Sequence, residues 1–250
     1  MKLTIVVLTR NEISNIADCL AGALKGEGLS LVPELLVIDD GSDDGTVELA
    51  RAAGARVVER RLTTFADQRN FALSQAKEGW VFFLDADERF SPALLNAIVR
   101  HMSEKPGMAG SVTRRNFAFG RRRRFGPLKP DRVVRLFPPG SVRWEGQVHE
   151  RPVFSIPASP LKGHLIHLTY HSWGQYLAKQ SRYAELWAQE ARAAGKTAGP
   201  LTAFSRAGLG FLKMFLLNLG FLGGPVTWCL CWYHATYTLT KYLKLSDPGL

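Results

Sequence analysis

The chain has 250 residues, of which 46% are hydrophobic, enough to bury the core of one large domain or of a domain with an appendage, which excludes a disordered chain. Its 32 Lys and Arg residues outnumber 22 Asp and Glu residues, and the formal net charge of +10 favours an anionic partner such as a phosphate, a nucleic acid or an acidic lipid. The three cysteines lack the spacing of a disulfide framework, which favours a reducing cytoplasm.

Strand-like and helix-like patterns alternate in the first hundred residues. Continuous apolar runs predict buried strands over residues 3–9, 34–39, 55–59 and 80–84. Helical spacing of apolar residues, with glycine stops, predicts helices over residues 11–24, 46–53, 64–79 and 91–102. The last of these begins with Ser91 as a cap and Pro92 at the first helical position. Alternation of this kind predicts an α/β fold with a parallel sheet covered by helices.

Polar segments follow three of these strands directly, at residues 9–12, 39–45 and 85–88. Ligands of such folds gather beyond the carboxyl ends of the strands, so we expect the three segments to meet at one crevice. Asp85 and Asp87 would repel each other there unless they hold a cation of the Mg or Mn type. A solvated turn at the strand end is the alternative. The segment at 39–45 lacks the spacing of an EF-hand loop, which favours a turn that offers Asp40 to a nucleoside.

Beyond residue 108 the pattern changes to short strands separated by Gly and Pro. These strands are expected within residues 110–120, 131–137, 141–154 and 161–171. A helix with an aromatic face follows over 173–187, and the last fifty residues are the most apolar of the chain. Gly223 to Pro225 split this tail into halves of roughly sixteen residues, each shorter than the ~20 that span a bilayer.

The apolar tail favours helices that lie in or dip into the cytoplasmic leaflet of a membrane. A buried helical hairpin or a dimer contact is an alternative. A full span is disfavoured because Lys213, Asn218 and His234 interrupt the apolar sequence. Residues 111–145 contain ten basic residues and two acidic ones, which suits nucleic acid or an acceptor or membrane that bears phosphates. The tail favours the second of these.

Four segments, in this order, resemble the signature of glycosyltransferase family 2, whose domains have the GT-A fold. They are VVLTRNE, LLVIDDGSDDGT, FADQRN and WVFFLDADE. Three later segments resemble the branch that contains the lipopolysaccharide inner-core glucosyltransferases acting on heptose. These are PDRVVRLF, WEGQVHE and IHLTYHSWGQYLAKQSRY, so that the resemblance covers most of the chain.

The resemblance implies a nucleotide-sugar donor, an inverting transfer and a set of residues that bind the donor. The residues implied for substrate binding are Thr9, Arg10, Asn11, Glu12, Asp40, Arg69, Asp85 and Arg135. A surface helix arginine is the alternative for Arg69. The resemblance also implies that Asp87 ligates a divalent cation, Mg or Mn, with Asp85 beside it. His164, His167 and His171 lack the further ligands of a zinc site, and histidines so placed in a strand and loop are more often structural. His167 is a candidate for a later contact to the metal or to phosphate.

An inverting displacement needs one carboxylate that takes the proton of the attacking hydroxyl. The resemblance points to Glu150 as this base, although many family members carry Asp in an ED pair where this chain has His149 and Glu150. A Glu150 paired with Arg143 or Arg151 at a strand edge is the alternative. Asp131 is the second candidate for the base.

The sequence thus predicts a GT-A-like α/β domain with a mostly parallel sheet over residues 1–170 and a helical, membrane-associating extension over 171–250. The predicted activity is an inverting, metal-dependent transfer of a hexose, glucose from UDP-glucose, to a lipid-linked saccharide such as inner-core heptose. Its predicted place is the inner face of the bacterial cytoplasmic membrane, as a peripheral protein. A polyprenyl-phosphate glycosyltransferase and, from another class, a basic nucleic-acid-binding protein are the alternatives, the latter disfavoured.

Overall fold

The computed structural model describes residues 1–25, 31–76, 79–146 and 150–247. The chain forms two compact units. The first consists of Met1–Arg114 and Asp131–His167, and the second of Arg115–Pro130 and Leu168–Leu250. The predicted division into a catalytic domain and a membrane-associating extension assigns roles as well as boundaries, and it stays a prediction.

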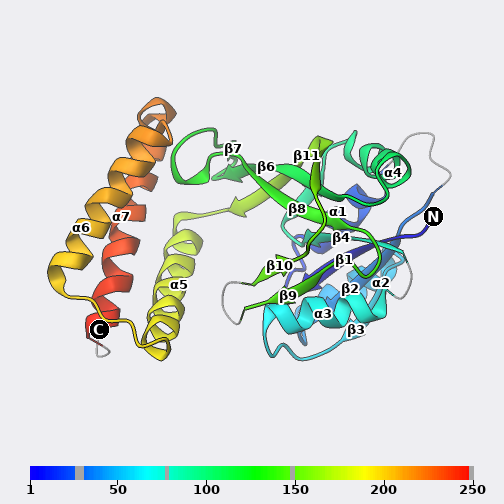
Figure 1. Cartoon of the computed structure of the whole chain (residues 1–250), viewed down its shortest axis with the longest axis horizontal. Helices are drawn as coiled ribbons and strands as arrows, with labels where there is room; N and C mark the ends of the chain where they lie inside the picture. The colour runs from blue at the N-terminus through cyan, green and yellow to red at the C-terminus, as the bar shows by residue number, and fades with distance from the viewer. Residues whose placement is uncertain (26–30, 77–78, 147–149, 248–250) are drawn as a thin grey trace. The chain divides into compact units, whose positions relative to one another are not determined.

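The first unit is built on a sheet whose strands lie in the order β3-β2-β1-β4-β8-β6-β11-β5 (Figure 1). The strands that pair in parallel are β1 (Leu3–Thr9), β2 (Glu34–Asp39), β3 (Arg56–Glu59) and β4 (Trp80–Asp85). Antiparallel strands extend the sheet, namely β5 (Glu88–Phe90), β6 (Ala109–Ala118), β8 (Asp131–Phe137) and β11 (Ala158–Tyr170). The short strands β9 (Arg143–Glu145) and β10 (Arg151–Val153) pair with each other. The predicted α/β class is confirmed.

Side chains alternate between the two faces of this sheet, and each face has its own helices. The helices of the unit are α1 (Ile16–Ala23), α2 (Thr46–Ala52), α3 (Phe65–Gln75) and α4 (Leu94–Glu104). Ile5 and Val7 of β1 belong to the core that includes α1, α2 and α4, whereas Val6 belongs to the core that includes α3. Strands buried on both faces need apolar residues at every position, which explains why β1, β2 and β4 read as continuous apolar runs.

The start of α4 differs from the sequence prediction. The helix begins at Leu94, and its N-cap is Ala93 rather than Ser91. The Ser91 hydroxyl instead accepts a hydrogen bond of 2.9 Å from the backbone N–H of His164 in β11. A tertiary contact between the end of β5 and the neighbouring strand therefore replaces the predicted local cap.

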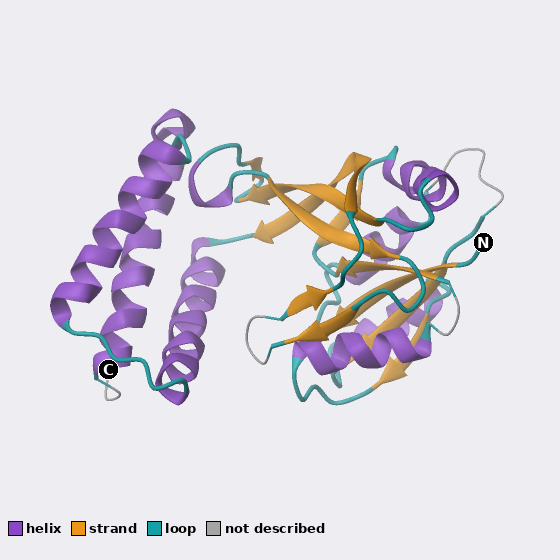
Figure 2. Ribbon diagram, in the orientation of Figure 1, coloured by secondary structure: helices purple, strands orange, loops and turns teal. Residues whose placement is uncertain are grey.

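The second unit is mainly helical (Figure 2). Its long helices are α5 (Trp173–Ala193), α6 (Pro200–Leu212) and α7 (Gly224–Ser246). A π-helical turn, Lys213–Leu217, and a 3-10 turn, Gly220–Gly223, connect α6 to α7. The unit also contains β7 (Arg121–Arg122), which pairs with the end of β6, and a 3-10 turn at Gly126–Leu128. Small residues buried on α5 and α6, such as Ala184, Ala188, Ala203 and Ala207, make room for close packing of helices.

Among the described helices, no single one combines the length and the apolar composition that crossing a membrane requires. The segments Pro200–Leu217 and Gly220–Ser246 meet that requirement only together, as a pair bent by 66° at the break between them.

Removal of the Phe82 ring tests the core of the first unit. Phe82 is fully buried and packs edge-on against Phe90, with 5.0 Å between ring centroids. We expect Phe82→Ala to lower the free energy of unfolding by about 3–5 kcal/mol, because the lost contacts leave a cavity. Urea denaturation measures this value.

Phe65→Ala is the matched control, because Phe65 is 48% exposed. We expect it to change the same free energy by less than about 0.5 kcal/mol. Equal effects of the two variants would contradict the placement of Phe82 in the core.

Candidate functional site

The carboxyl ends of β1, β2 and β4 place three polar segments at one edge of the sheet. Thr9 is aligned with Asp39 across the β1–β2 ladder, and Leu8 is aligned with Asp85 across the β1–β4 ladder. Because the three strands are parallel neighbours, their last residues lie next to each other. The segments 9–12, 39–45 and 85–88 therefore begin side by side, as the sequence predicted.

Two adjacent aspartates at the end of β2 have separate partners. Asp39 is fully buried and accepts hydrogen bonds from the Thr9 hydroxyl (2.8 Å) and from the backbone N–H of Ser42 (2.7 Å). Asp40 forms an ion pair of 2.9 Å with Arg10 and accepts a hydrogen bond of 2.7 Å from the backbone N–H of Leu62. Asp39 thus holds the turn after β2 through buried hydrogen bonds. Asp40 holds Arg10, which is largely exposed, through an ion pair.

The other two residues predicted after β1 connect loops. Asn11 has a left-handed backbone (φ 54°), and its side-chain oxygen accepts a hydrogen bond of 3.1 Å from the backbone N–H of Asp43. The backbone N–H of Glu12 donates to the Thr46 hydroxyl at 2.8 Å. The Glu12 carboxylate accepts a hydrogen bond of 2.8 Å from the Asn15 amide. Asn11 and Glu12 therefore fix the loop after β1 against the loop after β2.

Asp85, at the end of β4, lies in a cluster of ion pairs with arginines from two other elements. Arg135 of β8 reaches both of its oxygens, with Nη2 at 2.5 Å from Oδ2 and Nη1 at 3.3 Å from Oδ1. Arg69 of α3 donates Nη2 to Oδ1 at 3.2 Å. A third of the Asp85 side chain is exposed, whereas both arginine side chains are almost completely buried. The charged network thus reaches solvent at this aspartate.

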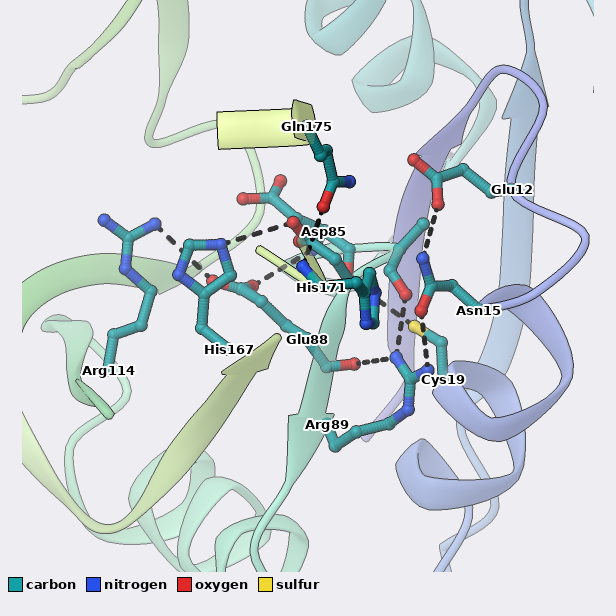
Figure 3. A network of polar contacts seen from close by, with 12 residues as sticks. Glu12, Asn15, Cys19, Asp85, Glu88, Arg89, Arg114, His167, His171 and Gln175 are labelled. Carbon is teal, nitrogen blue, oxygen red and sulfur yellow. Dashed lines mark hydrogen bonds and ion pairs between the residues drawn. The ribbon is translucent and has the colours of Figure 1, made fainter. Parts of the chain in front are cut away.

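Glu88 belongs to the same network and lies next to Asp85 (Figure 3). Its side chain is fully buried and accepts a hydrogen bond of 3.0 Å from Arg135 Nη2. Its other oxygen accepts a hydrogen bond of 3.1 Å from the backbone N–H of Asp85. Arg114 lies 3.7 Å from Glu88 and makes a two-pronged ion pair with Asp131, at 2.8 and 3.1 Å. Figure 3 shows Arg114 pointing toward Glu88, on the same side as His167.

The pKa values of the two carboxylates of this network are shifted in opposite directions. Burial by itself would raise the pKa of Asp85, but the charges of Arg135 and Arg69 outweigh it and hold that pKa well below its ordinary value. Burial raises the pKa of Glu88, and the neighbouring charge of Asp85 adds to this effect. Burial opposes the charge of Arg135, yet Asp85 and Glu88 together raise its pKa. Arg135 therefore remains charged and holds Asp85 in its ionised form.

Asp87 and His167 form a second polar pair, and they are the residues that suit a divalent cation. Asp87 Oδ2 lies 3.3 Å from His167 Nε2, and both side chains are partly exposed. His167 comes into reach because β11 pairs with β5, where it is aligned with Glu88. No group of three His, Cys, Asp or Glu side chains among the described residues is arranged to hold a metal ion. An Mg or Mn ion commonly takes one or two protein ligands together with substrate phosphates, so the Asp87–His167 pair fits such an ion.

Asp85, the other predicted metal ligand, has both oxygens engaged by arginines. A metal that bound it would have to share or replace these contacts. Its geometry suits a contact to the donor more than ligation of a cation, and both roles stay predictions.

The predicted base, Glu150, lies close to this network. Its Oε1 is 3.6 Å from Arg69 Nη2, so that one guanidinium lies between Glu150 and Asp85. Arg69, rather than Arg143 or Arg151, is its ion-pair partner among the described residues, and the preceding residues 147–149 lie outside them. Asp131, the second candidate, is held by both prongs of Arg114.

Three residues that hold the site together were not identified from the sequence, namely Asp39, Glu88 and Arg114. A signal for Glu88 was present in β8, where Arg135 stands in the apolar run between the partly buried Val134 and the fully buried Leu136. A buried arginine requires a carboxylate partner, and the acidic segment 85–88 was the obvious place to find it. The Nε atoms of Arg69 and Arg135 are buried without a hydrogen-bond partner among the described residues.

The family model described as glycosyl transferase family 2 matches residues 4–149, which is more than half of the chain. The chain therefore belongs to the family 2 glycosyltransferases, and the predicted family and class of enzyme are confirmed. This membership agrees with the GT-A-like fold expected from the sequence.

One relative matches most of the chain. The chain is 26% identical over 227 residues to the lipopolysaccharide core biosynthesis glycosyltransferase LpsC of Rhizobium meliloti (strain 1021), covering 87% of this chain and 82% of LpsC. It is 32% identical over 97 residues to an uncharacterized glycosyltransferase of Rickettsia prowazekii (strain Madrid E). That match covers 39% of this chain, and the chain spans about a third (32%) of that relative's length.

Two solved structures show weaker likeness. TarS 1-349 of S. aureus in complex with UDP-GlcNAc is 25% identical, with a TM-score of 0.37 and coverage of 47% of this chain and 34% of that one. Mannosyl-3-phosphoglycerate synthase from Rubrobacter xylanophilus is 26% identical, with a TM-score of 0.40 and coverage of 47% and 41%. At these TM-scores the likenesses carry no argument about fold or ligand.

Loss of Arg135 tests the buried network. We expect Arg135→Met to lower the free energy of unfolding by about 3–5 kcal/mol at neutral pH, because it leaves Asp85 and Glu88 without their shared cation. The low pKa of Asp85 makes a stabilising contribution above the ordinary Asp pKa of about 3.9, and that contribution is lost as the pH falls. The difference between the wild type and the variant should therefore stay nearly constant from pH 7 to about pH 5 and shrink from about pH 5 to about pH 2 in urea denaturation.

Arg132→Met is the matched control, because Arg132 is exposed on the same strand. We expect it to change stability by less than about 0.5 kcal/mol. A cost for Arg135→Met that did not depend on pH would contradict the assigned pairing.

Proposed function

We propose that this glycosyltransferase moves a hexose, glucose from UDP-glucose, onto a lipid-linked saccharide such as the inner-core heptose of lipopolysaccharide, with inversion at the anomeric carbon. The observation that carries the proposal is the similarity to LpsC, which extends over 87% of the chain, whereas the family match ends at residue 149. The likeness to an enzyme of lipopolysaccharide core biosynthesis thus includes the second unit as well as the sheet.

The donor is proposed to bind along the edge where β1, β2 and β4 end. Thr9 and Asp39 shape the floor of this edge, and Asp40 with Arg10 offers a carboxylate and a cation to the nucleoside. Asn11 and Glu12 hold the first loop in place. Asp85 reaches solvent in its ionised form and is proposed to accept hydrogen bonds from the ribose or the sugar hydroxyls.

The two arginines of the network are proposed to act on the same substrate. Arg135 orients Asp85 through two contacts, and its burial allows little movement of that carboxylate. Arg69 is stacked 4.6 Å above the Trp144 ring and 5.3 Å from the centroid of Phe83, which fixes its guanidinium between Asp85 and Glu150. Their positive charges favour a substrate that carries phosphate.

A divalent cation, Mg or Mn, is proposed to be held by Asp87 and His167, with the donor diphosphate as the remaining ligand. When bound, such a cation stabilises the negative charge that develops on the leaving diphosphate. His167 would offer such a cation Nε2, the ring nitrogen that faces Asp87.

Glu150 is proposed as the general base. Carboxylates are ordinarily ionised at neutral pH, the form that accepts a proton from the acceptor hydroxyl. The hydroxyl oxygen then forms the new bond to the anomeric carbon as the bond to the diphosphate breaks. A single displacement of this kind inverts the configuration.

The acceptor and the place of action follow from the same proposal. The enzyme is proposed to act at the inner face of the bacterial cytoplasmic membrane, as a peripheral protein. Polyprenyl phosphate is the competing acceptor, and an assay with both acceptors separates the two.

The metal assignment is tested by Asp87→Ala. We expect UDP to raise the melting temperature of the wild-type protein more with Mn than without, because a ligand that binds only the folded state stabilises it. The additional effect of Mn should disappear in Asp87→Ala, and a thermal-shift assay measures it. Asp18→Ala, which removes an exposed carboxylate of α1, should keep the effect. A full Mn effect in Asp87→Ala would refute the assignment.

The role of the base is tested by Glu150→Gln. We expect the rate of hexose transfer from UDP-glucose to a heptose-bearing lipid oligosaccharide to fall by at least about 100-fold, because the amide takes up no proton. UDP binding in the thermal-shift assay should stay unchanged. Glu145→Gln on β9 serves as the control and should keep most of the rate. Wild-type turnover in Glu150→Gln would remove Glu150 as the base.

A further inference from the structure

Two segments of the second unit contain charges of one sign only. Residues 115–130 and 197–246 carry ten Lys and Arg residues and no Asp or Glu. Desolvation and the like charges of Arg115 and Arg124 lower the pKa of Arg122. In the described part of this unit, Arg121, Arg122 and Arg124 are exposed and no acidic side chain pairs with them. A surface of this kind favours an anionic partner.

The loop that carries Arg121 to Arg124 is held in a defined shape by hydrogen bonds among its own residues and their neighbours. Arg123 is buried and donates Nη2 to the carbonyl oxygen of Ala118 at 2.9 Å. The Asn116 amide donates to the carbonyl oxygen of Lys129 at 3.0 Å. Arg123 thus has a structural part in the loop, and the other three arginines of the run remain directed to solvent.

The same loop is attached to the turn between α6 and α7. The backbone N–H of Gly126 donates to the carbonyl oxygen of Asn218 at 2.9 Å. Gly126 has a positive φ of 70°, and a Cβ at this position would lie 2.7 Å from Thr227 of α7. The loop and the turn are therefore packed without space for a side chain, and Figure 1 shows them next to each other.

The turn itself exposes large apolar side chains. Leu217 is 77% exposed and Leu222 is 56% exposed, where burial would be expected for leucine. The exposed apolar residues of the turn and the adjoining part of α7 are Leu216, Leu217, Leu219, Phe221, Leu222, Trp228 and Trp232. Gly220 packs against Cys231 and the Trp228 indole donates to the carbonyl oxygen of Phe221 at 3.0 Å, so the turn is ordered despite its exposed side chains.

We propose that the turn between α6 and α7 and the loop with Arg121, Arg122 and Arg124 form one docking site for a bilayer of anionic phospholipids. The leucine, phenylalanine and tryptophan side chains of the turn enter the boundary between headgroups and acyl chains. The three arginines bind the headgroup phosphates, for which the guanidinium fork is well matched. This inference extends the proposed membrane location and does not depend on glycosyl transfer.

The composition of the surface favours a bilayer over other partners. A second copy of this chain would bring the same positive charges against it, and like charges in contact disfavour association. Nucleic acid would bind the arginines but would leave the exposed leucines of the turn without a partner. An anionic bilayer matches both parts at once, since it offers phosphates at its surface and hydrocarbon beneath.

Vesicle flotation of the full-length protein tests the proposal, and it needs neither donor nor metal. We expect binding to vesicles of phosphatidylcholine and phosphatidylglycerol in equal parts, weaker binding to phosphatidylcholine alone, and release from the anionic vesicles at high salt. Arg121→Glu with Arg122→Glu should weaken binding to the anionic vesicles at least about tenfold. Leu217→Ser with Leu222→Ser should weaken it by a similar factor or more.

Matched controls make the same changes on exposed residues of the first unit. Lys25→Glu with Arg100→Glu and Val32→Ser with Leu49→Ser should bind as the wild type does. The proposal would be overturned if either variant of the site bound vesicles with wild-type affinity, or if the controls lost binding equally. It would also be overturned if the protein bound RNA in a gel-shift assay and did not bind vesicles. Failure of hexose transfer with intact flotation would refute the proposed function alone.

Discussion

The ion pair between Arg135 and Asp85, backed by Glu88, is the interaction on which the candidate site depends. It connects β8 with the end of β4, so the antiparallel strand next to the parallel part of the sheet supplies the guanidinium that pairs with Asp85 at the candidate site. Buried charges are stable only when they are paired and hydrogen-bonded, which means that none of the three side chains can be changed alone without cost. The same pairing keeps Asp85 ionised and turned toward solvent.

Arg69 extends this constraint to the proposed base. Its guanidinium lies over the rings of Phe83 and Trp144 and reaches both Asp85 and Glu150. Trp144 is fixed in turn by hydrogen bonds between its backbone and the Asn70 side chain, at 2.8 and 2.9 Å. In the QRN segment of α3, Arg69 therefore belongs to the charge network, and the next residue, Asn70, holds the backbone of β9. The proposed donor contact, Asp85, and the proposed base, Glu150, therefore both contact one arginine of α3.

The sequence alone predicted the strands more accurately than the details of the site. β1 and β2 match their predicted ranges because strands buried on both faces leave unbroken apolar runs between polar ends. The three polar segments were placed at one edge correctly, since parallel strands end on the same side. The pairing of Arg135 with Asp85 and Glu88 was missed, because a charged residue inside β8 indicates that a buried partner exists, but side chains 47 and 50 residues apart leave no local pattern that identifies it. The same reason explains Ser91, whose partner on β11 lies 73 residues further along the chain.

The central claim is that this family 2 glycosyltransferase acts on a lipid-linked core saccharide. The most direct test is mass spectrometry of the acceptor after incubation of the protein with UDP-glucose, Mn and, in separate reactions, a heptose-bearing lipid oligosaccharide or polyprenyl phosphate. The account predicts the addition of one hexose to the heptose-bearing lipid and none to polyprenyl phosphate. Addition to polyprenyl phosphate alone would contradict it and would assign the site to the competing acceptor.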